Sequence, residues 1–281
     1  MPTEPQAAHT VRLILGDQLN HAHSWFDRVD HGVLYVLMEV RQETDYAQHH
    51  VQKVLAFFAA MRRFADALRA QGHRVLYVAL DDQRNTQDMP ANLKWVLRSC
   101  GAVTFGYQLP DEVRLDEQLK DFARTCGCAV EVADTEHFLT TRDELASQFK
   151  GKKQFLMERF YRVMRERTGL LMAGKQPEGG HWNFDKDNRG RPAKSHVAPA
   201  PLFFDHDLRE LQQLIEKAGV KTMGTVDSAH VTWPLDREES LRLLDYFCTH
   251  LLPHFGTYQD SLMPGQWALF HARLSFSMNV K

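Results

Sequence analysis

The stretch VRLILGDQL, residues 11–19, passes from an apolar run into a glycine and an aspartate. Two further apolar runs follow, VLYVLMEV at 33–40 and RVLYVAL at 74–80, and weaker ones occupy 102–107 and 129–134. Continuous apolar runs without alternation are typical of strands that are covered on both faces. What separates these runs therefore decides the fold.

Segments with helical periodicity lie between the runs. Residues 49–71 carry apolar side chains at the spacing of one helical face, and Gly72 follows as a C-terminal cap. Residues 111–127 form a second helix candidate that also ends at a glycine. This alternation of strand and helix predicts an α/β domain with a doubly wound, parallel, five-stranded sheet.

Beyond this pattern the chain changes character. We expect three regions: an α/β domain at 1–135, a linker with a basic helix and a long loop at 136–235, and the start of an all-helical domain at 236–281. The basic helix should occupy residues 153–168. Asp236 and Glu239 have the spacing of a capping box, which predicts a helix start.

The C-terminal region carries two apolar patterns. One predicts an apolar helical face formed by Leu241, Leu244, Cys248 and Leu251. The other, at residues 266–280, is apolar nearly all round and predicts a helix enclosed in a larger core. Because the sequence stops within this pattern, we expect a helical domain that is cut off near its start and a chain that is not active alone.

The composition is that of an ordinary globular protein, with 43% hydrophobic and 25% charged residues among 281 and a net charge of −2. It argues against disordered, collagen-like and coiled-coil proteins. No apolar run approaches the roughly 20 residues of a membrane span, and the N-terminus lacks the features of a secretory signal. We therefore predict a cytoplasmic protein with no membrane partner. The four cysteines lack the spacing of a zinc site or a disulfide framework.

Polar residues follow the expected strands where ligands bind in such sheets, at the carboxyl ends. The first strand ends near Gly16, Asp17 and Gln18, and the second ends near Glu39. No glycine-rich phosphate loop follows any strand. Carboxylates at this edge would repel a pyrophosphate and suit a neutral heterocycle rich in hydrogen-bond donors. The alternative is that Asp17 caps a turn and Glu39 pairs with a nearby arginine.

A basic stretch and a long loop stand out in the middle of the chain. Residues 150–167 hold seven lysines and arginines with aromatic residues among them. The loop at 169–200 is rich in glycine and proline and contains His181-Trp182-Asn183-Phe184-Asp185. Such a surface could contact a phosphate backbone or a base. Equally, the basic residues could form a solvated helix face, and the aromatic residues could anchor the loop.

Seven motifs resemble those of the bacterial photolyase-related flavoproteins, which comprise the iron–sulfur cryptochromes and the prokaryotic (6-4) photolyases. The resemblance runs from about residue 11 to the last residue. The motif at 177–189 is long and specific. The motifs are LILGDQL at 13–19, EV at 39–40, HH at 49–50, MERFYRVMRERTGLLM at 157–172, PEGGHWNFDKDNR at 177–189, FGTYQD at 255–260 and FHARLSF at 270–276.

The resemblance implies two chromophores. The α/β domain would hold an antenna, 6,7-dimethyl-8-ribityllumazine, and the helical domain would hold FAD, which passes an electron to a UV lesion in DNA. The antenna residues would be Gly16, Asp17, Gln18, Leu19 and Glu39. The partial set of FAD residues would be Tyr258, His271, Arg273, Leu274 and Ser275.

The resemblance also implies UV-damaged DNA as the partner and a (6-4) photoproduct as the lesion. The DNA-binding residues would be Lys152, Lys153, Arg159, Trp182 and Arg189. Asp185 would bind a divalent cation beside the phosphates. The family also carries a 4Fe–4S cluster, whose ligands belong to a segment absent from this sequence, and no catalytic residue is assigned within residues 1–281.

Two alternatives remain open at this point. A cryptochrome-type blue-light photoreceptor without lyase activity would share the same motifs. An unrelated α/β nucleotide-binding enzyme with a helical extension would share the fold pattern alone. The sequence does not indicate the oligomeric state.

Overall fold

The computed structural model describes residues 7–192 and 197–281, so part of the long loop, residues 193–196, lies outside the described residues. The chain divides into two compact units. The first comprises Met1–His137, Leu202–Leu243 and Leu274–Lys281. The second comprises Phe138–Pro201 and Leu244–Arg273.

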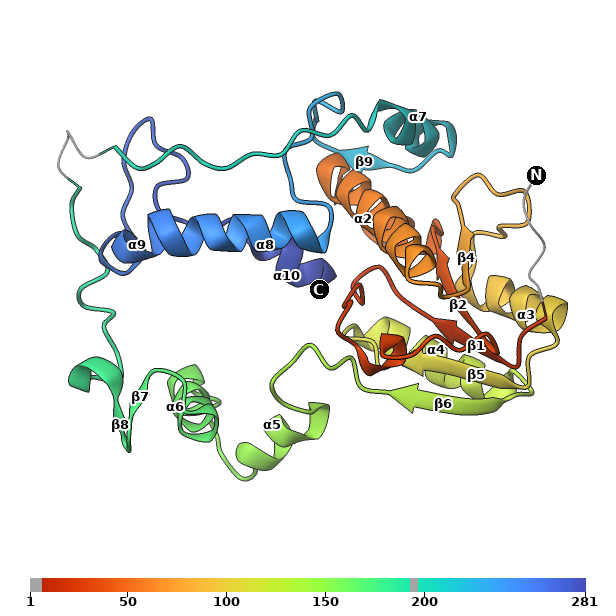
Figure 1. The fold of residues 1–281 in the computed structure, drawn as a ribbon, viewed down its shortest axis with the longest axis horizontal. Coiled ribbons are helices and arrows are strands. Elements are labelled where there is room, and N and C mark those ends of the chain that lie inside the picture. The colour runs from red at the N-terminus through yellow and green to blue at the C-terminus, as the bar shows by residue number, and fades with distance from the viewer. Residues whose placement is uncertain (1–6, 193–196) are drawn as a thin grey trace. The chain divides into compact units, whose positions relative to one another are not determined.

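A five-stranded parallel sheet forms the centre of the first unit, with the order β4-β2-β1-β5-β6 (Figure 1). Its strands are β1 (Thr10–Leu13), β2 (Val33–Met38), β4 (Val75–Val78), β5 (Thr104–Gln108) and β6 (Ala129–Ala133). Val11 of β1 lies in register with Leu34 of β2 and with Phe105 of β5. The predicted α/β fold with a parallel five-stranded sheet is therefore confirmed.

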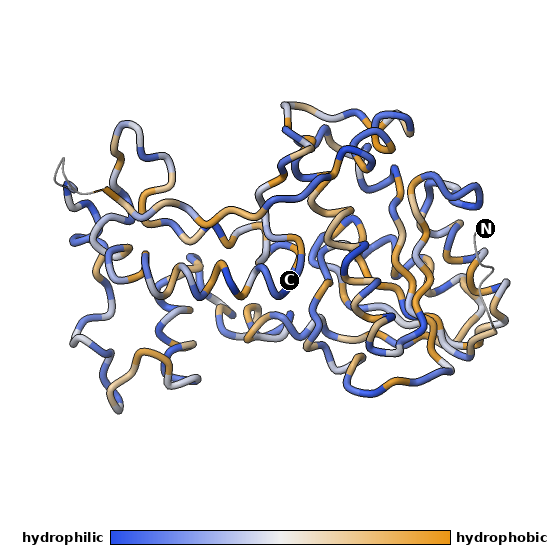
Figure 2. Tube along the Cα trace, turned by 45° about the horizontal axis from the view of Figure 1, so that its top comes forward, coloured by the Kyte–Doolittle hydropathy of each residue, from blue (hydrophilic) through white to orange (hydrophobic). Residues whose placement is uncertain are grey.

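Helices cover both faces of this sheet, which explains the continuous apolar runs. On one face α2 (Val51–Ala70) buries Leu55 and Leu68 against Tyr35 and Leu37. The opposite core packs side chains of α3 (Met89–Cys100) and α4 (Val113–Thr125) against alternate residues of the same strands. Figure 2 colours the chain by hydropathy and shows hydrophobic (orange) stretches alternating with hydrophilic (blue) ones along the chain.

Several later segments complete the first unit. They are α7 (Arg209–Lys217), β9 (Thr222–Met223), which pairs with β3 (His49–His50), the start of α8 (Arg237–Tyr246) and α10 (Ser275–Val280). Leu211 of α7, Phe276 of α10 and Leu235, which lies just before α8, join the core that includes α2. The unit is thus assembled from residues far apart in the sequence. At the start of α8, Asp236 accepts a hydrogen bond from the Glu239 amide, as a capping box predicts.

The second unit is built from short elements. They are α5 (Arg142–Gln148), α6 (Met157–Thr168), the hairpin of β7 (Met172–Ala173) and β8 (Gln176–Pro177), the end of α8, a π-helical turn at Phe247–Leu251 and α9 (Leu252–Tyr258). The basic helix predicted at 153–168 begins later, at Met157, and ends where Gly169 adopts a φ of 71°. Within the described ranges no helix is long and apolar enough to cross a membrane.

Two C-terminal predictions are wrong. The helix predicted at 266–280 is reduced to α10, because Leu269 and Arg273 adopt left-handed backbone conformations that interrupt it. The predicted apolar face is also broken: Leu241 and Leu244 are 49% and 40% exposed. The π-helical turn after α8 changes the residue spacing, so positions that share a face of a regular α-helix separate there.

Candidate functional site

A cavity of about 610 Å³ opens at the carboxyl edge of the sheet in the first unit. The strand order reverses at β1: β2 and β4 lie on one side of β1, and β5 and β6 lie on the other. Ligands of doubly wound sheets bind outside the strand ends at this reversal. Gly16 and Asp17 line the cavity after β1, and Asp111 and Glu112 line it after β5. Its volume lies in the range of roughly 300–1,000 Å³ that is usual for ligand pockets.

One wall of the cavity is aromatic and apolar. Phe57 and Met61 come from α2, while Trp233 and Phe276 come from much later segments. The Phe276 ring centroid lies 5.7 Å from that of Phe57 and 5.0 Å from that of Trp233. Gly16 allows α2 to approach closely, since a Cβ there would lie 3.0 Å from the Met61 sulfur. This wall suits the faces and edges of a flat ring.

Another part of the lining is polar, and Arg114 contacts it. Its guanidinium donates hydrogen bonds to Glu43 at 2.7 Å and to Glu112 at 2.8 Å, and it lies 4.4 Å from the Tyr46 ring centroid. Burial raises the pKa of Tyr46, so its hydroxyl remains a neutral donor. Lys53 lies at the rim, with Nζ 3.3 Å from His49 Nδ1.

Asp111 anchors a second polar cluster. Its carboxylate accepts hydrogen bonds from Lys281 at 2.8 Å and from His137 at 3.2 Å. Partial burial opposes ionisation, but these two donors outweigh it and lower the pKa of Asp111 to about 2. The cluster therefore stays ionised and joins α10 to the loop after β5.

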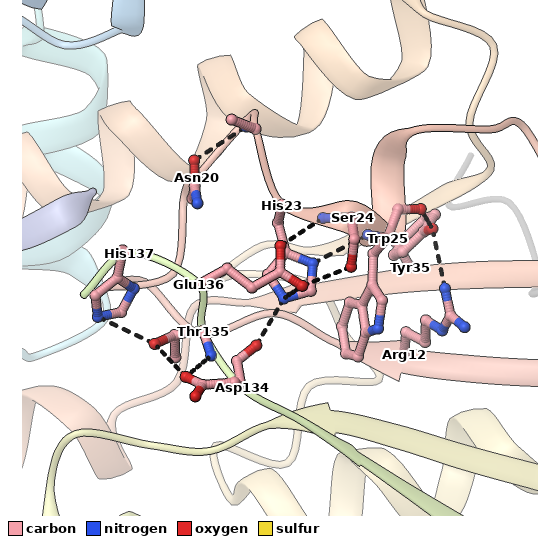
Figure 3. A network of polar contacts seen from close by, with 11 residues as sticks. Arg12, Asn20, His23, Ser24, Trp25, Tyr35, Asp134, Thr135, Glu136 and His137 are labelled. Carbon is pink, nitrogen blue, oxygen red and sulfur yellow. Dashed lines mark hydrogen bonds and ion pairs between the residues drawn. The ribbon is translucent and has the colours of Figure 1, made fainter. Parts of the chain in front are cut away.

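A network of hydrogen bonds holds the loop that carries His137 (Figure 3). His23 is completely buried; its Nδ1 accepts from the Trp25 amide, so its Nε2 donates to the Asp134 carbonyl at 2.8 Å. The Glu136 carboxylate accepts from the hydroxyl of Ser24 at 2.6 Å and from its amide at 2.9 Å. These contacts fix the chain after β6, and with it the position of His137.

Asp17 differs from the other carboxylates of the cavity. Burial raises its pKa; the nearby charges of Lys281 and Asp111 act in opposite directions. Within the part of the chain that the structure describes, no other side chain donates a hydrogen bond to its carboxylate. Asp17 is therefore the acidic group of this cavity that is most available to a ligand.

The five residues predicted to hold the antenna differ in whether they line the cavity. Gly16 and Asp17 line the cavity, as described. Gln18 and Leu19 lie behind it: Gln18 donates to the Gln108 carbonyl at 3.3 Å, and the Leu19 amide donates to the Val280 carbonyl at 2.9 Å. These bonds tie the end of β1 to β5 and to α10, so both residues shape the cavity without lining it.

Glu39 lies outside the cavity lining. It is completely buried and accepts two hydrogen bonds from Arg62, at 2.7 and 3.0 Å. Tyr77 donates a third at 2.6 Å and the Leu80 amide a fourth at 2.9 Å. Pairing with an arginine, the alternative considered from sequence, is the arrangement that the structure shows for Glu39.

The residues predicted to contact FAD fall in different units. Tyr258, His271 and Arg273 belong to the second unit, and Leu274 and Ser275 to the first. The Tyr258 ring stacks on Phe270 at 5.3 Å. Ser275 lines the cavity at the sheet edge.

The residues of the second unit that were predicted to bind DNA differ in the contacts they make within the protein. Trp182 lies close to two arginines of α6, with its ring centroid 5.1 Å from the Arg162 guanidinium carbon and 5.2 Å from that of Arg165. Arg189 pairs with Asp260 at 3.5 Å. Three further residues were predicted to bind DNA, and all three are exposed: Lys152, Lys153 and Arg159.

Asp185 is exposed and accepts a hydrogen bond from Asn183 at 3.2 Å. Across residues 7–192 and 197–281, no group of three or more histidines, cysteines, aspartates or glutamates is arranged to hold a metal ion. The four cysteines are free thiols.

Sequence reasoning missed most of the cavity lining. The missed residues include Tyr46, His49, Lys53, Phe57, Asp111, Glu112, Trp233, Phe276 and Lys281. One signal was present: Asp111 follows the fourth apolar run of the chain as Asp17 follows the first. The contributions of Trp233 and Phe276 depend on contacts between distant segments, which no local pattern reveals.

Comparisons with known proteins identify the family of the chain. The model of the deoxyribodipyrimidine photo-lyase-related protein family matches residues 12–231. A (6-4) photolyase of Agrobacterium fabrum is 34% identical over 270 residues, which cover 95% of this chain and 53% of the relative. An uncharacterised protein of Acanthamoeba polyphaga mimivirus is 25% identical over 149 residues, which cover 51% of this chain and 73% of the relative. The chain thus spans about half the length of the photolyase that it matches.

Proposed function

Since the chain belongs to the deoxyribodipyrimidine photo-lyase-related family, we propose that it is the N-terminal part of a light-driven DNA-repair lyase, and that its first unit holds the antenna chromophore. The observation that carries the proposal is the cavity at the strand reversal, whose lining combines aromatic side chains with carboxylates. Membership of this family argues against an unrelated nucleotide-binding enzyme.

The cavity residues fit 6,7-dimethyl-8-ribityllumazine. Its fused rings match the wall of Phe57, Trp233 and Phe276, where edge and face contacts with aromatic side chains are available. Its ribityl hydroxyls are hydrogen-bond donors, and Asp17 and Glu112 offer carboxylate acceptors in the same cavity. When bound, this chromophore would absorb light and transfer the excitation energy to a flavin.

The proposal extends to FAD with a smaller set of residues. In the second unit the rings of Tyr258 and His271 pack against Phe270 and Phe255. These contacts make a compact aromatic cluster, and Arg273 adds a cation beside Trp267. We propose FAD as a cofactor of the longer protein on the family resemblance, with these residues as part of its surroundings. The 4Fe–4S cluster is not assigned to any cysteine of this chain.

UV-damaged DNA is the proposed partner of the second unit. Lys152, Lys153 and Arg159 present exposed positive charge to a phosphate backbone. Trp182, which lies close to two arginines of α6, and Arg189 would extend this surface, and Asp185 would recruit a divalent cation. Repair is favoured over photosensing because the relative from Agrobacterium fabrum is named a (6-4) photolyase. A DNA substrate agrees with the cytoplasmic location expected from the sequence.

Extraction of the bound chromophore tests the antenna assignment. The chain is produced in a bacterium that makes riboflavin, and the small molecules it retains are identified by absorbance and mass spectrometry. We expect ribityl-lumazine in the purified protein and its loss in Phe276→Ala, which removes a ring from the cavity wall. Trp267→Ala, at an exposed ring of the second unit, is the matched control and should retain it. A folded chain that neither retains lumazine nor takes it up when supplied would overturn the proposal.

Salt-dependent binding to UV-irradiated duplex DNA tests the second unit. Replacing Lys152, Lys153 and Arg159 together by alanine should reduce the slope of log affinity against log salt by up to about 2.7, since each phosphate contact contributes about 0.9. Arg124→Ala, which removes an exposed arginine of the first unit, serves as the control and should leave the slope unchanged. An unchanged slope in the triple variant would remove these residues from the proposed surface.

A further inference from the structure

We propose that Asp17 makes the cavity selective for a heterocycle with an uncharged polyhydroxyl side chain over the same kind of heterocycle that ends in a phosphate. This inference rests on the proposed function, because it concerns the ligand of the same cavity. Riboflavin and its 5′-phosphate, FMN, form such a pair.

The charges around the cavity favour an uncharged ligand. Four carboxylates line it, those of Asp17, Glu43, Asp111 and Glu112, and the lining cations are Lys53 and Lys281. Arg114 neutralises part of the charge from behind, but it is shared between Glu43 and Glu112. Burial and Lys53 lower the pKa of His49, so this side chain is neutral at pH 7 and does not add a cation.

The cations close to the carboxylates are already engaged. Arg114 contacts two of them, and Lys281 binds Asp111 at 2.8 Å. Lys53 is exposed at the rim, where its charge is screened by solvent and salt. A phosphate that entered the cavity would therefore lose hydration without gaining an unpaired internal cation, which is costly.

Asp17 adds a direct penalty for a phosphate. Its carboxylate faces the cavity without a donor from another described side chain, so a ligand hydroxyl or ring N–H can donate to it. A phosphate oxygen has no proton to donate at neutral pH and would meet a like charge, a juxtaposition that weakens binding. Specificity of this kind comes from repulsion of the wrong ligand as much as from attraction of the right one.

Binding titrations with three probes test the proposal: ribityl-lumazine, riboflavin and FMN, followed by fluorescence anisotropy. The full chain should bind riboflavin at least about tenfold more tightly than FMN. In Asp17→Asn the preference should fall about fivefold or more, because the amide removes the charge and can donate to a phosphate oxygen. Asp121→Asn, the same substitution at an exposed site outside the cavity, should keep the preference. Thermal unfolding verifies that both variants are folded.

The possible results distinguish the role of Asp17 from the assignment of the cavity as the antenna site. FMN binding as tight as riboflavin binding, or an unchanged preference in Asp17→Asn, would overturn the role of Asp17 while leaving the antenna site intact. Failure of all three probes to bind the folded chain would overturn the antenna site itself, and this inference with it. A preference that weakens as salt concentration rises would support an electrostatic origin.

Discussion

Glu39 and Asp17 both lie at the carboxyl edge of one sheet, yet their surroundings are opposite. Glu39, at the end of β2, accepts four hydrogen bonds from Arg62, Tyr77 and the Leu80 amide. Asp17, after β1, faces a cavity and receives none from another described side chain. The same chemical group therefore stabilises the fold at one position and is available to a ligand at the other. Which role a carboxylate takes depends on the donors that the rest of the fold brings to it.

The largest difference between the two regions should appear on removal of Glu39. Glu39→Ala leaves the Arg62 guanidinium, the Tyr77 hydroxyl and the Leu80 amide without their acceptor. We expect a loss of about 3 kcal/mol in the free energy of unfolding, the lower end for a broken buried pair because the Arg62 side chain is 36% exposed. Urea denaturation measures it. A loss below about 1 kcal/mol would show that Glu39 is not the structural carboxylate described here.

Removal of one donor from the same network should have a smaller effect. Tyr77→Phe deletes the hydroxyl that donates to Glu39 at 2.6 Å, and we expect a loss of about 2 kcal/mol, as is usual for a hydrogen bond to a charged group. Tyr46→Phe is the matched control, because Tyr46 is 51% exposed and its stability effect should stay within about 0.5 kcal/mol. Equal losses in the two variants would contradict the comparison.

Asp111 should show a pH-dependent effect. Its folded pKa of about 2 lies below the ordinary value of 3.8, so its contribution to stability is present above pH 4 and is lost as the pH falls toward 2. Asp111→Asn should lose about 1 kcal/mol at pH 7 and show a flatter stability profile between pH 4 and pH 2. Denaturation at a series of pH values measures both. A parallel profile for the variant would show that Lys281 and His137 do not act through this carboxylate.

The smallest effect is expected at Asp17. Burial raises its pKa, so its contribution to stability is present below the ordinary value of 3.8 and is lost as the pH rises through the folded pKa. Asp17→Asn places a neutral group there at all pH values. At pH 7 its free energy of unfolding should therefore exceed that of the unchanged chain by a small amount, below about 1 kcal/mol. A clear loss of stability at neutral pH would mean that Asp17, like Glu39, has a structural role.

The sheet was predictable because its determinants are local. Each strand was expected as an apolar run, and the glycines at position 72 and at the end of residues 111–127 mark helix ends. The position of Asp17 at a strand end followed from the same pattern. The partners of Glu39 did not: Arg62 lies 23 residues away and Tyr77 lies 38 residues away, and only the folded β2–β4 edge brings them together.

Other parts of the site depend on distant or irregular segments. Phe276 of α10 and Lys281, which follows α10, line the cavity, and sequence reasoning placed residues 266–280 in one long helix. Left-handed residues such as Leu269 and Arg273 carry no compositional signal that distinguishes them from helical ones. The sequence left open whether Trp182 anchors its loop or contacts a nucleic acid, and no local pattern indicated that its ring lies close to Arg162 and Arg165 of α6.

Tryptophan fluorescence tests the central claim, that the cavity at the strand reversal binds an aromatic heterocycle. Trp233 lines the cavity, so ribityl-lumazine bound there should quench its emission in a saturable way. In Trp233→Phe most of this quenching should disappear, while the anisotropy of the lumazine still reports binding. Binding with the same tryptophan quenching in Trp233→Phe would place the ligand elsewhere, and a folded chain that binds no lumazine would contradict the account.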